Sequence, residues 1–224
     1  MSTEAKVPLS STPSEVAAPE GHANPEERIL AVAYELFSRR GVRDVGVNEL
    51  IERSGVAKAT FYRHFPSKDS LVLAFLEQRD KLWTVEAIVT QARRRGKTPV
   101  ERLLAIFDVL GEWFQREDFE GSTFIHVLLE MGPSHPLGQA SIDYLAKLRG
   151  HVQTMAEEAG LVSPDEFARS WQILMKGSMI SATGGDLQAA RRAQRMAGWL
   201  IEHHTASPEV RGADSNAGVA ASDK

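Results

Sequence analysis

Residues 47–65 read VNELIERSGVAKATFYRHF, and this stretch decides the fold of the amino-terminal part of the chain. Its first eight residues place three apolar side chains on one face of a short helix, and Gly55 follows directly, where glycine can adopt the left-handed conformation of a tight turn. The remainder predicts another short helix, in which Phe61 and Phe65 lie four residues apart and therefore on the same side. The pattern predicts a helix-turn-helix whose second helix turns two aromatic rings toward a small core.

The opposite face of that second helix is polar. If Phe61 and Phe65 point inward, the outward-facing residues are Lys58, Ala59, Thr60, Tyr62, Arg63 and His64. Lysine can reach a guanine edge, threonine offers a hydroxyl and a methyl group, and tyrosine, arginine and histidine can bind phosphates. We therefore predict that this face binds the major groove of double-stranded DNA, although the same helical pattern also arises from packing alone.

The distribution of charge favours the same interpretation. Between residues 39 and 68, seven basic side chains stand against three acidic ones, so this segment carries +4 in a chain whose net charge is −4. A local basic surface on an acidic body is typical of a small phosphate-contacting module and not of a protein that coats nucleic acid over its whole surface. A basic run this short is also compatible with an ordinary solvated face.

The composition of the 224 residues excludes several other classes of protein. Hydrophobic residues make up 42% of the chain, enough for a sizeable core, and the absence of cysteine removes disulfide frameworks, thiolate zinc sites and cysteine nucleophiles. No apolar run approaches the ~18 residues that a membrane-spanning helix requires. The first 24 residues contain neither a basic start nor an apolar h-region. We expect a cytoplasmic protein that has no membrane partner.

Helical periodicity extends between two polar tails, without a convincing alternating strand. Residues 1–24 and 205–224 lack aromatic side chains and are expected to be disordered. The folded body is predicted to be all-α. Besides the two short helices, over 47–54 and 57–64, we expect helices over 25–40, from 68 onward, and over 99–114, 122–131, 136–159, 163–183 and 186–203, with Ser67 and Ser163 as N-caps.

One part of the sequence resembles a known family. Residues 55–68, GVAKATFYRHFPSK, together with Leu71, are similar to the turn, the recognition helix and the start of the next helix in the TetR/AcrR family of bacterial regulators. Leu36, Phe37 and Gly41 resemble the first helix of that family. The similarity covers residues 29–76, about a fifth of the chain.

The resemblance implies a role for each polar residue of the motif. It directs three residues to base edges, namely Lys58, Ala59 and Thr60. It assigns phosphate contacts to Tyr62, His64 and Lys68, either kind of contact to Arg63, and a weaker contact to Asn48. Gly46 departs from the family, which often has a threonine or serine there, so contacts from the first short helix are in doubt.

The resemblance also implies two domains with different roles. Residues 25–70 would form the helix-turn-helix DNA-binding domain, and residues 71–204 a helical domain that binds an effector and dimerises. Small residues that permit close helix approach make up the expected dimer interface: Gly177, Ser178, Ser181, Ala182, Ala190, Ala193 and Ala197. Aromatic and other soft side chains make up the expected effector pocket, unless they only fill the core: Phe107, Trp113, Phe114, Phe124, His126, Met131, Tyr144, Trp171 and Met175.

By this resemblance the chain is expected to be a homodimeric repressor that releases a palindromic operator when a small, mainly apolar effector binds. One alternative is a DNA-binding regulator without an effector. Another is a helical enzyme, for which His126 with Glu130, and the pair His203 and His204, are the candidate groups. These histidines lack further ligands at suitable spacing, and no phosphate loop or nucleophile motif is present, so we expect neither catalysis nor a metal or other cofactor.

Overall fold

The computed structural model describes residues 24–205, and helices dominate this part of the chain. Within these residues the one isolated β-bridge joins Leu161 and Thr205. The prediction of an all-α fold is therefore confirmed. The two predicted tails lie outside the described residues, except for Asn24, which caps the first described helix, and Thr205, which forms the bridge.

The described chain divides into two compact units. The first unit comprises residues 24–88 and 115–147, and the second comprises residues 89–114 and 148–205. The helices of the first unit are α2 (Pro25–Arg40), α3 (Val47–Ser54), α4 (Lys58–His64), α5 (Lys68–Arg79) and α8 (Thr123–Met131). Those of the second are α6 (Gln91–Arg95), α7 (Pro99–Phe114), α10 (Pro164–Thr183) and α11 (Ala189–His204). Two helices contribute to both units, the π-helix η1 (Asp80–Thr90) and α9 (Pro136–Glu158).

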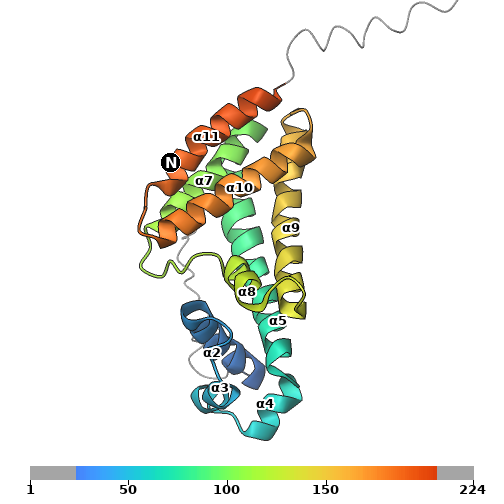
Figure 1. Ribbon diagram of the computed structural model, residues 1–224, viewed down its shortest axis with the longest axis vertical. Coiled ribbons are helices and arrows are strands. Elements are labelled where there is room, and N and C mark those ends of the chain that lie inside the picture. Colours follow the sequence, from blue (N-terminus) through green and yellow to red (C-terminus); the bar gives the residue numbers. More distant parts are fainter. Residues whose placement is uncertain (1–23, 206–224) are drawn as a thin grey trace, which may run out of the picture. The chain divides into compact units, whose positions relative to one another are not determined.

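Helices α2, α3, α4 and α5 lie close together in the first unit (Figure 1), and their buried side chains form its core. Ile29, Leu50, Phe61 and Phe75, one from each helix, are completely buried. The ring of Tyr34 meets that of Phe75 edge-on, with the centroids 5.5 Å apart. Full burial of such a side chain contributes ~1.5–3 kcal/mol to stability. The short helix α4 is therefore held in place largely through Phe61.

Capping residues explain where α2 and α5 begin. The side chain of Asn24 accepts a hydrogen bond from the Glu27 N–H at 2.9 Å, and the Glu27 carboxylate accepts one from the Asn24 N–H at 3.0 Å. The side chain of Ser67 accepts a hydrogen bond from the Ser70 N–H at 3.1 Å, which confirms Ser67 as an N-cap. Both caps satisfy backbone donors that the first helical turn leaves unpaired.

Ser163 occupies the N-cap position of α10, as predicted, but it does not cap the helix through its side chain. Its backbone is left-handed, with φ of 53°, and its side chain accepts no capping hydrogen bond. The residues before it are held by the end of α11, because the Val162 N–H donates to the His204 carbonyl at 2.8 Å and Leu161 pairs with Thr205. The chain therefore turns sharply from this bridge into α10, which begins at Pro164.

The change of helix type between residues 80 and 95 is not evident in the local sequence pattern. No glycine or proline interrupts residues 68–95, yet α5 changes into η1 and then into α6. At the junction, the guanidinium of Arg79 lies 5.0 Å from the ring centroid of Tyr34 and 4.9 Å from that of Trp83. The Trp83 indole N–H donates to the Tyr34 hydroxyl at 3.0 Å. The change of helix type therefore coincides with long-range contacts, which local periodicity does not reveal.

In the second unit, α7, α10 and α11 pack against one another (Figure 1). The close approach of α7 and α11 uses small residues, since a Cβ on Gly111 would lie 3.5 Å from the Cβ of Ala190. Between α7 and α10, the rings of Phe107 and Trp171 have centroids 5.1 Å apart. Phe167, one turn before Trp171, adds a third buried ring at 5.2 Å. Small residues and stacked rings thus form the core of this unit.

Candidate nucleic-acid interface

The outward face of α4 carries the polar residues that the sequence predicts there. Phe61 is completely buried and Phe65 is 5% exposed, whereas the other face of the helix is open to solvent. Four of its predicted DNA contacts are exposed, namely Lys58, Ala59, Tyr62 and Arg63, and two are half-buried, namely Thr60 and His64. No ion pair to Lys58 or Arg63 occurs among residues 24–205. These two cations are therefore available to phosphates or base edges.

The turn between α3 and α4 has the predicted geometry. Gly55 ends α3 in the left-handed conformation, with φ of 63° and ψ of 28°. The side chain of Arg28, from the first turn of α2, donates to the Ser54 carbonyl at 2.6 Å and to the Gly55 carbonyl at 3.0 Å. The contact of Arg28 with this turn cannot be predicted from the sequence, because its partners lie 26 and 27 residues away and no local pattern links them.

Two further predicted contacts lie at helix starts. Lys68 is the first residue of α5, directly after the N-cap Ser67, where backbone N–H groups also favour anions. Burial lowers the pKa of Lys68 below its ordinary value, while Glu130, Asp69 and Asp44 act in the opposite direction. Asn48 is exposed in the first turn of α3. The N-cap of that helix is Gly46, which makes no side-chain hydrogen bond.

The +4 counted for residues 39–68 overstates the positive charge that faces outward. Arg40 pairs with Glu49 at 2.6 Å, and Arg53 pairs with Glu35 at 3.0 Å. These pairs join α2 to α3. Glu49 is already included in the count, whereas Glu35 lies outside residues 39–68 and offsets a positive charge that the count treats as available. The cations of α4, Lys58 and Arg63, form no ion pair among the described residues. The basic surface is therefore concentrated on the recognition helix and the start of α5.

One of the predicted phosphate ligands already has a neighbour. Nδ1 of His64, at the end of α4, lies 3.5 Å from the carboxylate of Glu26 in the first turn of α2. This contact is an ion pair only when the imidazole is protonated. A DNA phosphate would therefore compete with Glu26 for this side chain.

Comparison with known proteins agrees with this geometry. Residues 29–75 match the family model described as bacterial regulatory proteins, tetR family. The chain carries a DNA-binding domain of the TetR family. Its matched segment runs from α2 through α5 and includes the whole helix-turn-helix described above. The chain is therefore a DNA-binding transcriptional regulator, and the alternative of a helical enzyme is set aside.

Relatives of this TetR-family regulator show how far the likeness extends. It is 27% identical over 143 residues to the HTH-type transcriptional repressor KstR of Mycolicibacterium smegmatis, which covers 63% of this chain and 67% of KstR. It is 30% identical over 93 residues to the HTH-type transcriptional activator FasR of the same organism, covering 40% of each protein. A crystal structure of a putative TetR-type regulator from Streptomyces avermitilis superimposes with a TM-score of 0.73 at 28% identity, over 81% of this chain and 98% of that one.

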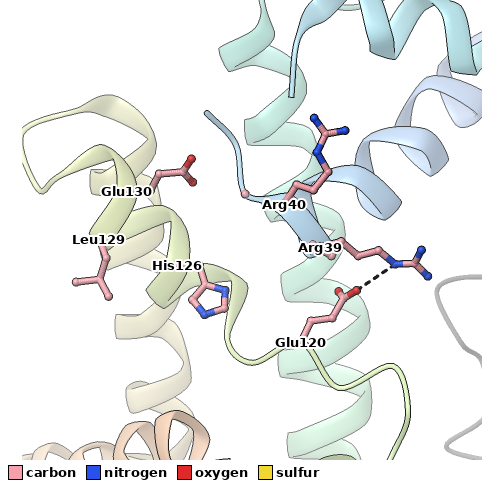
Figure 2. A pocket seen from close by; sticks show the side chains of 8 residues that line it. Arg39, Arg40, Glu120, His126, Leu129 and Glu130 are labelled. Atoms are coloured by element: carbon pink, nitrogen blue, oxygen red, sulfur yellow. Dashed lines mark ion pairs between the residues drawn. The ribbon is translucent and has the colours of Figure 1, made fainter. Parts of the chain in front are cut away.

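A cavity of about 640 Å³ opens beside the end of α2 in the first unit of the regulator. It is lined by Ser38, Arg39, Arg40, Gly41, Glu120, His126, Leu129 and Glu130. Figure 2 shows His126 and Glu130 projecting from α8 toward this space, and Arg39 reaching Glu120 at 3.6 Å. Burial is the main cause of two shifts here, because it raises the pKa of Glu120 and lowers that of His126. His126 is the predicted effector residue that lines this cavity.

The carboxylate of Glu130 ties α8 to the loop after α2. It accepts a hydrogen bond from the Val42 N–H at 2.9 Å and a second, very short one from the Arg43 N–H. Gly41 permits this approach, since it adopts a φ of 80° and a Cβ there would lie 3.2 Å from the carboxylate. This link was also missed from the sequence, because Glu130 lies almost 90 residues from its partners.

The structure distributes the other predicted effector residues over both units. The second unit holds five, all buried: Phe107, Trp113, Phe114, Trp171 and Met175. The first unit holds Phe124, His126, Met131 and Tyr144. Phe124 and Tyr144 stack with centroids 5.2 Å apart and, with Met131, pack against the core of the DNA-binding helices. These three therefore contribute to the core of the first unit.

The predicted dimer residues need a correction. Five of the seven are buried within a single chain, on α10 and α11: Ser178, Ala182, Ala190, Ala193 and Ala197. Gly177 and Ser181 are exposed. Small residues do signal close helix approach, but here the approach is intramolecular. The exposed apolar residues of α10 and α11 are instead Ile173, Ile180, Met196 and Trp199.

Two features are absent from the described part of the chain. Residues 24–205 contain no group of three or more histidine or acidic side chains arranged to hold a metal ion. Among the same residues, no helix combines the length and apolar character needed to cross a bilayer.

Proposed function

We propose that this regulator is a homodimeric repressor that binds a palindromic operator through two copies of α4 and releases it when a small, mainly apolar effector binds. The observation that carries the proposal is the face of α4, where Lys58 and Arg63 are exposed and have no carboxylate partner among residues 24–205, inside a motif matched to a DNA-binding family. Since one such helix reads only a few base pairs, a two-fold dimer gives the specificity that one copy lacks. Because the matched family consists of bacterial regulatory proteins, we propose the cytoplasm as the site of this activity.

The exposed apolar residues of the last two helices support the dimer. Ile173 is 71% exposed and Ile180 is 50% exposed, and they lie with Gly177 on one stripe of α10. On α11, Trp199 is 66% exposed and Met196 is 50% exposed. Large apolar side chains in such exposed positions mark surfaces that another protein covers. A second copy of the chain supplies the same stripes and completes a symmetric interface.

The second unit offers a suitable environment for an effector. Its core contains a cluster of buried apolar side chains: Phe107, Phe114, Trp171 and Met175. The Trp171 indole N–H is buried there without an acceptor among the described residues. An unpaired buried donor costs free energy, which an acceptor on a bound ligand would recover. An apolar ligand with one hydrogen-bond acceptor fits this combination.

The names of the relatives leave the direction of regulation open to experiment. KstR is named a repressor and FasR an activator, although both are similar to this chain. The second candidate function is therefore a regulator that activates transcription from its operator. A reporter gene placed behind the selected operator separates the two, because deletion of the regulator raises expression in one case and lowers it in the other.

The test of DNA binding begins with selection of a site from random double-stranded DNA by the full chain. We expect a palindrome whose half-site centres lie about one helical turn, ~34 Å, apart, bound by a dimer. A single half-site bound by a monomer at micromolar protein would refute the two-fold model. A screen of apolar aromatic compounds then tests the effector, which should raise the melting temperature and weaken operator binding together, since the two effects are linked.

A further inference from the structure

Arg28 binds the turn between α3 and α4, which sets the direction of α4. Its Nη2 donates to the last carbonyl of α3, on Ser54, at 2.6 Å, and to the carbonyl of Gly55 at 3.0 Å. Carbonyls at the end of a helix lack intrahelical partners and carry the negative end of the helix dipole. A guanidinium therefore stabilises this end of α3 and at the same time fixes the direction in which the chain leaves it.

The recognition helix has few other restraints at that end. α4 has only seven residues, and its N-cap Ala57 makes no side-chain hydrogen bond. A helix this short is not stable alone in water, so its position depends on contacts with its neighbours. Phe61 and Phe65 pack α4 against the core, and Val56 packs there from the turn, but non-directional apolar contacts do not by themselves set the angle at which the helix start approaches DNA.

Gly55 is shaped to admit the guanidinium. A Cβ at this position would lie 2.6 Å from Nη2 of Arg28, too close for any side chain unless the arginine moves. Because Arg28 is held by its two hydrogen bonds, such a movement would break them. The glycine thus serves both the left-handed turn and the close approach of Arg28.

The first turn of α2 also reaches the other end of α4. Glu26, two residues before Arg28, lies 3.5 Å from the imidazole of His64. Residues of one helical turn therefore contact both the turn that precedes the recognition helix and the last residue of that helix. This arrangement restrains rotation of α4 on the pivot of Phe61.

We propose that Arg28 is a positioning residue for DNA recognition, which orients α4 by binding the carbonyls of Ser54 and Gly55 and contacts neither base nor phosphate itself. The proposal rests on the proposed function, since it presupposes that α4 reads an operator. It identifies a determinant of specificity that lies on α2, outside the recognition helix.

The central experiment compares wild type with Arg28→Met and Arg28→Lys on the selected operator and on random DNA. Arg28→Met keeps the aliphatic stem and removes both hydrogen bonds, so operator affinity should fall about 10-fold or more while random-DNA affinity is unchanged. Arg28→Lys retains a donor and should recover part of the loss. The same substitution at an exposed arginine of α6, Arg94→Met, is the matched control and should bind as wild type does.

Salt dependence and melting temperature separate positioning from two other roles. If Arg28 neutralised a phosphate, Arg28→Met would lower the slope of log affinity against log salt by about 1 and weaken all DNA alike, and the proposal would be overturned. If Arg28 served stability only, the melting temperature would fall while the folded fraction kept its operator affinity, which would also overturn it. Failure of wild type to prefer any operator would instead refute the proposed function.

A double-mutant cycle with Gly55 adds a direct test of the contact. Gly55→Ala should weaken operator binding in wild type because the new methyl group displaces Arg28 and strains the left-handed turn. In the Arg28→Met background only the strain remains, so the additional loss should be smaller. Additive losses would show that the two residues act independently and would contradict the proposal.

Discussion

The recognition helix α4 and the last helix α11 differ in how they carry function. α4 presents isolated polar side chains to solvent, and each can act on DNA through its own chemistry. α11 hides its small residues inside the chain and exposes large apolar ones, Met196 and Trp199, whose action requires a second surface. The comparison teaches that a local sequence pattern can reveal a chemical site, whereas an assembly surface depends on which face of the helix the tertiary fold leaves open.

The largest expected effect comes from breaking the assembly surface. Trp199→Glu places a charge on a side chain that is 66% exposed in the single chain. If this side chain lies centrally in the dimer interface, the dimer dissociation constant should rise about 100-fold or more, equal to ~2.8 kcal/mol, as for other central aromatic residues. Analytical ultracentrifugation measures the dissociation constant, and operator affinity at nanomolar protein should fall with it.

A matched change on an exposed apolar residue elsewhere provides the control. Val85→Glu, in η1 of the first unit, alters a side chain that is 37% exposed and should leave the dimer intact. Ala197→Leu tests the corrected assignment, because this residue is completely buried within one chain. Overpacking there should lower the free energy of unfolding by ~1–3 kcal/mol. Dimer dissociation by Ala197→Leu without loss of stability would restore the small residues to the interface.

The contrast between these helices also explains what could be predicted. The inward direction of Phe61 and Phe65 and the outward direction of Lys58 follow from helical spacing alone, and the structure confirms them. The capping role of Ser67 follows from local chemistry in the same way. The family resemblance then gives these exposed residues their expected roles.

Other features depend on partners that are distant in sequence. Arg28 and Glu130 each bind backbone groups of another segment, and nothing in their own neighbourhood shows it. Ser163 fits every local rule for an N-cap, yet the bridge between Leu161 and Thr205 bends the chain away from that geometry. Ala193 signals close packing without indicating which helix approaches. Such outcomes are decided by tertiary contacts and lie beyond local periodicity.

A second prediction sharpens the assignment of single contacts at the first unit. Lys58→Ala should lower affinity by ~1–3 kcal/mol at one base position and relax the preference there, if Lys58 reads a base edge. Lys68→Ala should weaken binding to all sequences and reduce the salt slope by about 1, because a phosphate contact is blind to sequence. Anisotropy titrations with single-substitution operators at several salt concentrations measure both. An equal loss on every sequence for Lys58→Ala would reassign it to a phosphate.

The smallest expected effect concerns His126, which lines the cavity beside α2. Burial is the main cause that lowers its pKa below 6.5, and Arg79 acts in the same direction, while Glu130, one turn further along α8, opposes them. The folded protein therefore binds fewer protons at this site than the unfolded chain does. Its contribution to stability is present above pH 6.5 and is lost as the pH falls through the pKa of the folded state.

Thermal unfolding between pH 7.5 and pH 5.5 measures this contribution against His126→Gln, which cannot be protonated in this range. The melting temperature of wild type should fall more steeply toward acidic pH than that of the variant, and other titrating groups cancel in the difference. The effect should be small, because the side chain is only half-buried and solvent screens its charge. Parallel curves for the two proteins would show that the imidazole is equally easy to protonate in the folded and unfolded chains. An effector that fills the cavity should steepen the wild-type curve, since it removes more water from His126 and lowers its pKa further.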